Sequence, residues 1–146
     1  MAVTKTMGYQ FLKEEADGEH DLTGAISLKI VLMTPAFAFN PATHSQYSDI
    51  SASEIATGYG YTQKTKELEN ITNVETASGS TVGCDNVTWT ASAGAIATTG
   101  SACIINDTHG NDTVICCIDF GADYSTTDGT LLQIDFTNGI FSKSNA

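Results

Sequence analysis

The stretch Ile26-Ser27-Leu28-Lys29-Ile30-Val31-Leu32 alternates large apolar residues with smaller or polar ones. This period of two places Ile26, Leu28, Ile30 and Leu32 on one face, which is typical of a half-buried β-strand. Further segments rich in β-branched and aromatic residues follow near 81–90, 95–105, 113–120 and 130–136, separated by Gly-, Asn- and Asp-rich turns. Short strands with regular turn signals predict an all-β chain: a β-sandwich, a jelly roll or a small barrel.

Between residues 34 and 74 the pattern is less regular. Residues 34–47 contain both prolines of the chain and predict a long loop. Ser51 is followed three residues later by Glu54, which predicts one helical turn at 51–56 capped by Ser51. The sequence Gly58-Tyr59-Gly60-Tyr61 predicts a turn that opens a polar strand at about 62–74.

The first residues differ from the strand pattern that follows them. Apolar residues with loose helical spacing precede an acidic run at 14–19. We therefore expect an N-terminal arm at 1–21 and a single β-sandwich domain at 22–146. Apolar side chains outside the strand pattern, and aromatic residues in a long loop, more often mark an interface than a core. The candidate interface residues are Val3, Met7, Phe11, Leu12, Phe37, Phe39 and Tyr47.

The charge of the chain excludes some partners. The 146 residues carry a formal net charge of −11, from 17 acids against six lysines, with no arginine. Binding to nucleic acid needs clustered lysine and arginine, and anionic membrane surfaces attract basic segments. We therefore expect neither nucleic acid nor a membrane as a partner. The missing arginine also removes the usual bidentate clamp for phosphate or carboxylate ligands.

The N-terminal segment and the cysteines bear on the compartment. Residues 1–21 contain no apolar run of the kind found in signal peptides, so we expect synthesis and folding in a cytoplasm. Cysteines are reduced there, and we expect four free thiols, at Cys84, Cys103, Cys116 and Cys117. Cys116 and Cys117 are neighbours on a predicted strand, so one side chain points into the core and the other toward a second layer. The alternative, a zinc site, lacks a C-x-x-C pair and a histidine at ligand spacing.

The sequence offers no catalytic motif. His20, His44 and His109 are far apart in predicted loops, without a nucleophile-elbow signature near them. The turn at 106–112 carries side-chain oxygens but lacks the spacing of an EF-hand, so we expect a solvated hairpin loop. Trp89 is expected to anchor the core rather than to bind a sugar. We therefore expect no catalytic residues, no metal and no cofactor, in a protein that is not an enzyme.

Three stretches, in order along the chain, carry a resemblance to a known family. They are Leu28-Lys29-Ile30-Val31-Leu32-Met33-Thr34, then Asp49-Ile50-Ser51-Ala52-Ser53-Glu54-Ile55-Ala56 leading into Gly58-Tyr59-Gly60-Tyr61-Thr62, and finally Ile118-Asp119-Phe120-Gly121 followed by Gly129, Ile134-Asp135-Phe136 and Gly139-Ile140-Phe141. Together they span most of the chain and resemble small virion proteins of tailed bacteriophages. The pair Cys116-Cys117 and the aromatic loop with Phe37 and Phe39 depart from that pattern.

The resemblance implies a capsid decoration, or cement, protein on the outside of a virion. Such a protein is made in the host cytoplasm, binds across junctions of the major capsid protein, and is expected here as a homotrimer. A second hypothesis is a receptor- or carbohydrate-binding module of a tail or fibre. That module would use Tyr59, Tyr61 and Trp89 as a platform of exposed rings, so the exposure of these rings separates the two hypotheses.

Overall fold

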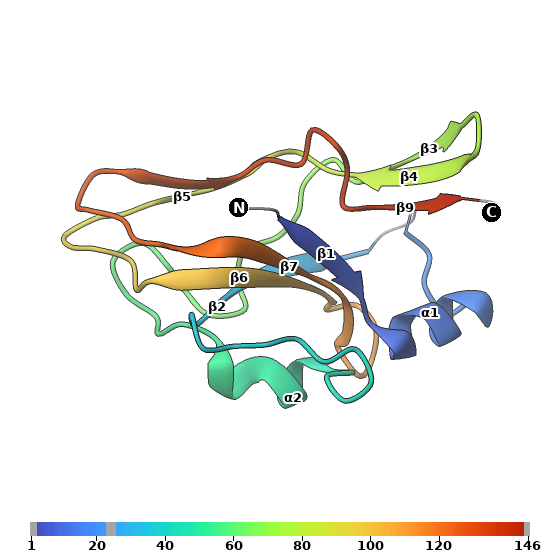
Figure 1. Ribbon diagram of the computed structural model, residues 1–146, viewed down its shortest axis with the longest axis horizontal. Coiled ribbons are helices and arrows are strands. Elements are labelled where there is room, and N and C mark those ends of the chain that lie inside the picture. The colour runs from blue at the N-terminus through green and yellow to red at the C-terminus, as the bar shows by residue number, and fades with distance from the viewer. Residues whose placement is uncertain (1–2, 23–25, 145–146) are drawn as a thin grey trace.

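The computed structural model describes residues 3–22 and 26–144, and its two β-layers pack face to face across a core (Figure 1). The first layer is an antiparallel sheet in the order β1-β7-β6-β2, with β1 at Thr4–Met7, β7 at Thr113–Tyr124, β6 at Thr99–Asn106 and β2 at Leu28–Met33. The second layer contains the pair β5 (Val87–Thr90) and β8 (Leu131–Ile134), and the sheet β3-β4-β9 formed by Thr72–Thr76, Gly79–Gly83 and Phe141–Ser144. Strands make up 41% of the chain and helices 11%, so the predicted all-β, sandwich-like fold is confirmed.

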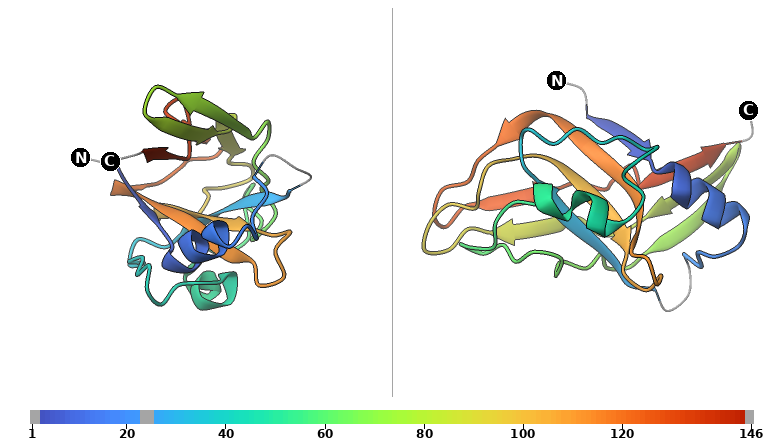
Figure 2. Two further views of the ribbon diagram at one scale, coloured as in Figure 1. Left: turned by 90° about the vertical axis from the view of Figure 1, so that its right-hand side faces the viewer. Right: turned by 90° about the horizontal axis from the view of Figure 1, so that it is seen from below.

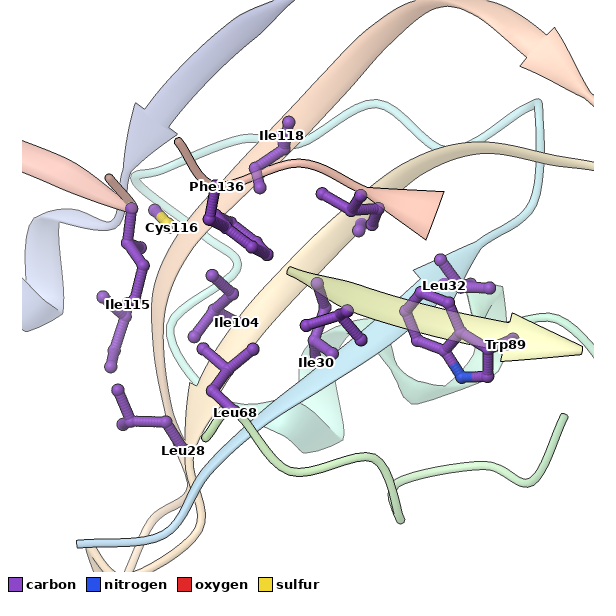
Figure 3. Close-up of a cluster of buried hydrophobic side chains, with 14 of the residues drawn as sticks. Leu28, Ile30, Leu32, Leu68, Trp89, Ile104, Ile115, Cys116, Ile118 and Phe136 are labelled. Carbon is purple, nitrogen blue, oxygen red and sulfur yellow. The ribbon is translucent and has the colours of Figure 1, made fainter. Parts of the chain in front are cut away.

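The main core lies between the two layers. Leu28, Ile30 and Leu32 of β2 point into it, as the alternation predicts. Trp89 reaches the same cluster from β5 in the opposite layer (Figure 3). Burial of a large apolar side chain stabilises the fold by roughly 1.5–3 kcal/mol. The facing strands β2 and β5 therefore hold the layers together, and the prediction of Trp89 as a core residue is confirmed.

The outer face of the first sheet is buried as well. The segment 34–53, with α2 (Tyr47–Ile50) and the 3-10 turn η1 (Ser51–Ser53), lies across this face (Figure 2). Beneath it, Val31 and Met33 of β2 pack with Ile50 in a second apolar cluster. β2 is thus buried on both faces, rather than on one as predicted, because the loop forms a third layer.

Two local predictions in this region are only partly right. A helical turn does occur at Ser51–Ser53, but it continues α2, which begins at Tyr47 with a capping box formed by Gln46 and Asp49, so the predicted cap at Ser51 is wrong. The predicted polar strand at 62–74 exists only from Thr72 onward. Residues 66–68 instead lie along the outer edge of β2, where the Ile30 N–H donates to Lys66 O at 2.9 Å and the Leu68 N–H donates to Leu28 O at 2.8 Å.

The N-terminal segment is part of the folded domain. All four residues of β1 pair antiparallel with β7. The helix α1 (Tyr9–Ala16) follows and packs at the end of the sandwich (Figure 1). The expected arm includes residues 1–2, which lie outside the described residues; within 3–21, Thr4–Met7 form an edge strand and Tyr9–Ala16 a helix of the sandwich. β1 satisfies backbone groups of β7 that would otherwise lack a protein partner.

The expectation of four free thiols is wrong for two cysteines. β6 and β7 are joined by the predicted hairpin turn, and they pair so that Cys103 lies opposite Cys117. The two Cα atoms are 4.1 Å apart and the sulfurs form a disulfide. Cys84 and Cys116 are free. Cys116 lies in the main core and Cys117 in the second cluster, which confirms that these neighbours point to opposite faces.

Candidate functional site

The predicted interface residues of the N-terminal segment differ in exposure. Val3 is 57% exposed and Leu12 is 39% exposed. Met7 is partly buried, and Phe11 is fully buried in the main core, in edge-to-face contact with Phe141 of β9 at 5.5 Å between ring centroids. Phe11 was expected to have no place in the core. That expectation is wrong because α1 packs on the sandwich and turns this side chain inward, where no partner can reach it.

The other three predicted interface residues, Phe37, Phe39 and Tyr47, lie on segment 34–53. All three are partly buried against the second apolar cluster. The Phe37 and Phe39 rings lie 5.3 and 5.8 Å from the imidazole of His44. Tyr47 donates a 2.6 Å hydrogen bond to Glu54, and its burial together with this carboxylate raises the pKa of Tyr47. These aromatic side chains serve first to cover the outer face of the sheet.

An apolar groove opens beside β1. Its volume is about 250 Å³, and Lys5 of β1 forms one wall together with Val3, the residue just before β1. The remaining lining is mainly apolar and comes from β7, β8 and the residues after β8, including Ile118, Phe120, Tyr124, Leu132, Ile134 and Phe136. Tyr124 is 48% exposed at the mouth of the groove. Sequence reasoning did not find this groove because its walls come from strands that are distant in the chain.

The strand β1 itself is the outermost strand of its sheet. Within residues 3–22 and 26–144, no strand pairs with its outer edge. Side chains alternate along β1 and the residue before it, so that Val3 and Lys5 line the apolar groove, whereas Thr4 and Thr6 line a second cavity of about 260 Å³ on the other face. An open strand edge flanked by cavities on both faces can accept an extended segment of another chain.

A buried polar cluster joins α1 to the turn between β6 and β7. Glu14 Oε2 accepts hydrogen bonds from His20 Nε2 at 2.9 Å and from the Thr113 hydroxyl at 2.7 Å. Its other oxygen accepts one from the Gln10 amide at 2.6 Å, and His109 Nδ1 lies 3.9 Å from Oε2. Burial raises the pKa of Glu14, but the hydrogen bonds together with the charge of His109 outweigh burial and hold that pKa below its usual range.

Hydrogen bonds also orient the two histidines of this cluster. Asn106 Oδ1 accepts the backbone N–H groups of Thr108 and His109, so Asn106 Nδ2 faces His20 Nδ1 at 2.8 Å. His20 therefore accepts at Nδ1 and carries its proton on Nε2, toward Glu14. His109 Nε2 lies 3.2 Å from a carboxylate oxygen of Glu19. The sequence separates these histidines, and the packing of α1 on the β6–β7 turn brings them together.

The ring platform of the carbohydrate-binding hypothesis is not formed by its three candidate residues. Trp89 and Tyr61 are both buried in the main core, and Tyr59 alone is exposed. The Tyr61 hydroxyl donates to Glu54 at 2.5 Å and accepts the Leu32 N–H at 2.9 Å, which fixes the ring inside the fold. Two of the three rings therefore cannot stack on a sugar.

Comparisons of the chain with protein-family models, with curated proteins and with solved structures find no match. Among the described residues, no helix is both long enough and apolar enough to cross a bilayer. The features that remain for a functional argument are the groove with the open β1 edge, and the buried Glu14–His20–His109 cluster.

Proposed function

We propose that this protein is a structural subunit, not an enzyme, and that it attaches to a larger assembly through a β1 docking surface. This surface consists of the outer edge of β1 and the groove lined by Val3, Lys5, Phe120, Tyr124 and Leu132. The observation that carries the proposal is an outermost strand beside an apolar groove. A segment that pairs with β1 satisfies its outward backbone groups, and alternate side chains of that segment fill the groove.

The distribution of exposed apolar side chains supports this position. Seven large apolar side chains are exposed among the described residues, and Val3, Tyr9 and Leu12 lie within the first 12 positions of the chain. Tyr124 is a fourth and borders the same groove as Val3. Each such side chain gains up to roughly 1.5–3 kcal/mol when a partner covers it fully.

The assembly that we propose is the head of a tailed bacteriophage. The protein acts there as a homotrimeric decoration protein on the capsid surface and binds across junctions of the major capsid protein. The resemblance of the three motif stretches supports this class, and a net charge of −11 suits a protein that does not bind the packaged genome. Specific interfaces bury about 1,200–2,000 Å² in total, and in a trimer the three docking surfaces contribute to such an area together.

Attachment to capsids that lack the protein tests this proposal. Val3→Ser and Tyr124→Ser, combined in one variant, remove apolar surface from the groove. Val74→Ser is the matched control, because Val74 lies on β3 and is 56% exposed, close to the exposure of Val3. We expect the wild type and the control to co-sediment with capsids, and the double variant to bind about tenfold more weakly or worse.

Two results would contradict different parts of the proposal. If the double variant binds like the wild type, the docking surface lies elsewhere on the molecule. If the wild type does not bind, and electron microscopy of particles shows no added density at capsid junctions, the assignment to the capsid is wrong.

A further inference from the structure

We propose that Glu14, His20 and His109 bind one zinc-like divalent transition-metal ion, which fastens α1 to the turn between β6 and β7. The three ligand atoms, Glu14 Oε2, His20 Nε2 and His109 Nδ1, all lie within 4.8 Å of one another. The sequence predicts no metal site because a metal-binding motif is recognised by the local spacing of its ligands. These three ligands come from three separate segments of the chain. This inference does not rest on the proposed capsid function.

The distances between the ligand atoms suit a small ion. Zinc binds histidine nitrogen and carboxylate oxygen at about 2.0–2.2 Å in tetrahedral geometry, so neighbouring ligand atoms lie about 3.3 Å apart. The distance from Glu14 Oε2 is 2.9 Å to His20 Nε2 and 3.9 Å to His109 Nδ1. The first pair must open and the second must close, each by less than about 1 Å, and the two histidine nitrogens, which lie within 4.8 Å of each other, must reach the same separation. Three protein ligands leave the fourth position of zinc for water.

The charge of the cluster favours a cation. The Glu14 side chain is buried, and among the described residues its ion-pair partners are His20 and His109, with no lysine. Neutral donors, the Gln10 amide and the Thr113 hydroxyl, supply its other hydrogen bonds. A buried carboxylate is stable only when it is paired or well hydrogen-bonded, and a divalent ion provides the stronger partner.

In each histidine, the ring nitrogen that does not bind the ion faces another residue. These two residues differ in how well they suit a bound ion. His109 Nε2 faces Glu19, so the ring can donate there, an arrangement common around zinc. Its Nδ1 lies 3.1 Å from the Thr113 hydroxyl and must exchange that contact for the ion. In His20, binding at Nε2 moves the proton to Nδ1, with no net release of a proton. Nδ1 then faces the Asn106 Nδ2 group, which is also a donor. Asn106 must turn its amide, so this residue limits the affinity.

A cavity borders one side of the cluster, at His109. This cavity of about 290 Å³ is bordered by Glu19, Asp21, Asn106 and His109. Carboxylates near an opening raise the local concentration of cations. His109 thus stands between solvent and the buried pair Glu14 and His20, and it is the ligand that an ion meets first.

Zinc titration of the full-length protein, by calorimetry and by thermal unfolding, tests the inference. We expect one Zn²⁺ per chain and a rise in melting temperature, and no effect of Mg²⁺, which prefers oxygen ligands. His109→Ala should abolish binding and still fold, because residue 109 lies in a turn and is partly exposed. His44→Ala is the matched control and should bind like the wild type. Glu19→Gln should weaken binding about tenfold.

Three outcomes overturn the inference. They are the absence of stoichiometric Zn²⁺ binding, unchanged binding by His109→Ala, and binding that is lost on Cys84→Ser instead, which would place the ion on a free thiol.

Asn106→Asp gives an independent test of the same geometry. An aspartate at this position can accept both the Thr108 N–H and a proton on His20 Nδ1, as carboxylates do beside many zinc-bound histidines. The variant adds a second buried negative charge, so its melting temperature without zinc should fall. With zinc, its rise in melting temperature should exceed that of the wild type. A smaller rise than in the wild type contradicts the assignment of His20 as a ligand through Nε2.

Discussion

The disulfide between Cys103 and Cys117 joins the two central strands of the first sheet, and both residues are buried. Alkylation of the denatured, unreduced protein should modify two cysteines, Cys84 and Cys116, and prior reduction should raise the number to four, counted by mass spectrometry. Denaturation is necessary because burial raises the pKa of Cys116 to about 12 and that of Cys84 to about 11, which keeps both as unreactive thiols near neutral pH. Four modified cysteines before reduction would show that the bond does not form.

Phe11 and Leu12 are adjacent on α1 and form a matched pair of different burial. Phe11 is fully buried against Phe141, whereas Leu12 is partly exposed. Loss of a buried phenylalanine side chain costs about 3–5 kcal/mol, and substitutions of exposed residues usually change stability by about 0.5 kcal/mol or less. Phe11→Ala should therefore lower the free energy of unfolding by about 3–5 kcal/mol in urea, and Leu12→Ala by less than about 1 kcal/mol. Equal losses would mean that α1 does not pack on the core.

Single residues also show what a local pattern can predict. The opposite orientation of Cys116 and Cys117 follows from the period of two in any strand. The bond of Cys117 to Cys103 does not, because it depends on which residue of β6 faces which residue of β7, and a shift by one position turns every side chain to the other face. The burial of Phe11 likewise depends on where α1 docks, which eight helical residues do not encode.

Among the elements, the turn between β6 and β7 connects three segments through Asp107. Its carboxylate lies 2.6 Å from Lys29 Nζ of β2 and 3.3 Å from Lys64 Nζ. The Lys29 contact, with a smaller contribution from Lys64, holds the pKa of Asp107 below its usual range. A carboxyl group whose pKa is lower in the folded state stabilises the protein above its unfolded pKa of about 3.9, and this stabilisation is lost as pH falls through the folded value.

Urea unfolding of Asp107→Asn at several pH values tests this link. At pH 7 the variant should be less stable than the wild type by about 1 kcal/mol, the upper end for ion pairs that remain partly solvated. The difference should shrink toward zero at about pH 2–3, where the wild-type carboxyl is protonated as well. Asp128→Asn removes one negative charge from an exposed turn and serves as the control. A difference that stays constant with pH would mean that Asp107 contributes packing and not charge.

The elements also divide by how far the sequence determines them. Regular strands such as β2, β6, β7 and β8 follow from composition and turn signals, because their patterns are local. The path of residues 62–71 does not follow from the sequence, because most of these residues are polar and residues 66–68 are held by backbone pairing with the edge of β2. Residues 34–47 were predicted as a loop, and α2 begins only at Tyr47, yet the packing of segment 34–53 over the second cluster depends on a sheet face that exists only in the folded protein.

At the scale of the whole molecule, both candidate sites are products of long-range packing. Glu14 and Thr113 are hydrogen-bonded across 99 positions of sequence. The groove beside β1 needs the first sheet and β8 to be in place before it has walls. Residue types alone therefore predict neither the groove beside β1 nor the meeting of His20 with His109.

The oligomeric state of the whole molecule is open to a direct measurement. Outermost strands need protection from unspecific pairing; β1 is assigned to the capsid partner, and a closed ring of three copies protects a further edge, such as that of β3, in each copy. Each subunit carries a net charge of −11, so three subunits repel one another, and salt screens this repulsion over about 30 Å at 0.01 M but only about 10 Å at 0.1 M. Light scattering coupled to size exclusion should therefore give three times the 15.4 kDa chain mass near 0.15 M salt, and a larger share of monomer near 0.01 M. A monomer at both salt concentrations, with tens of micromolar protein, would contradict the trimer.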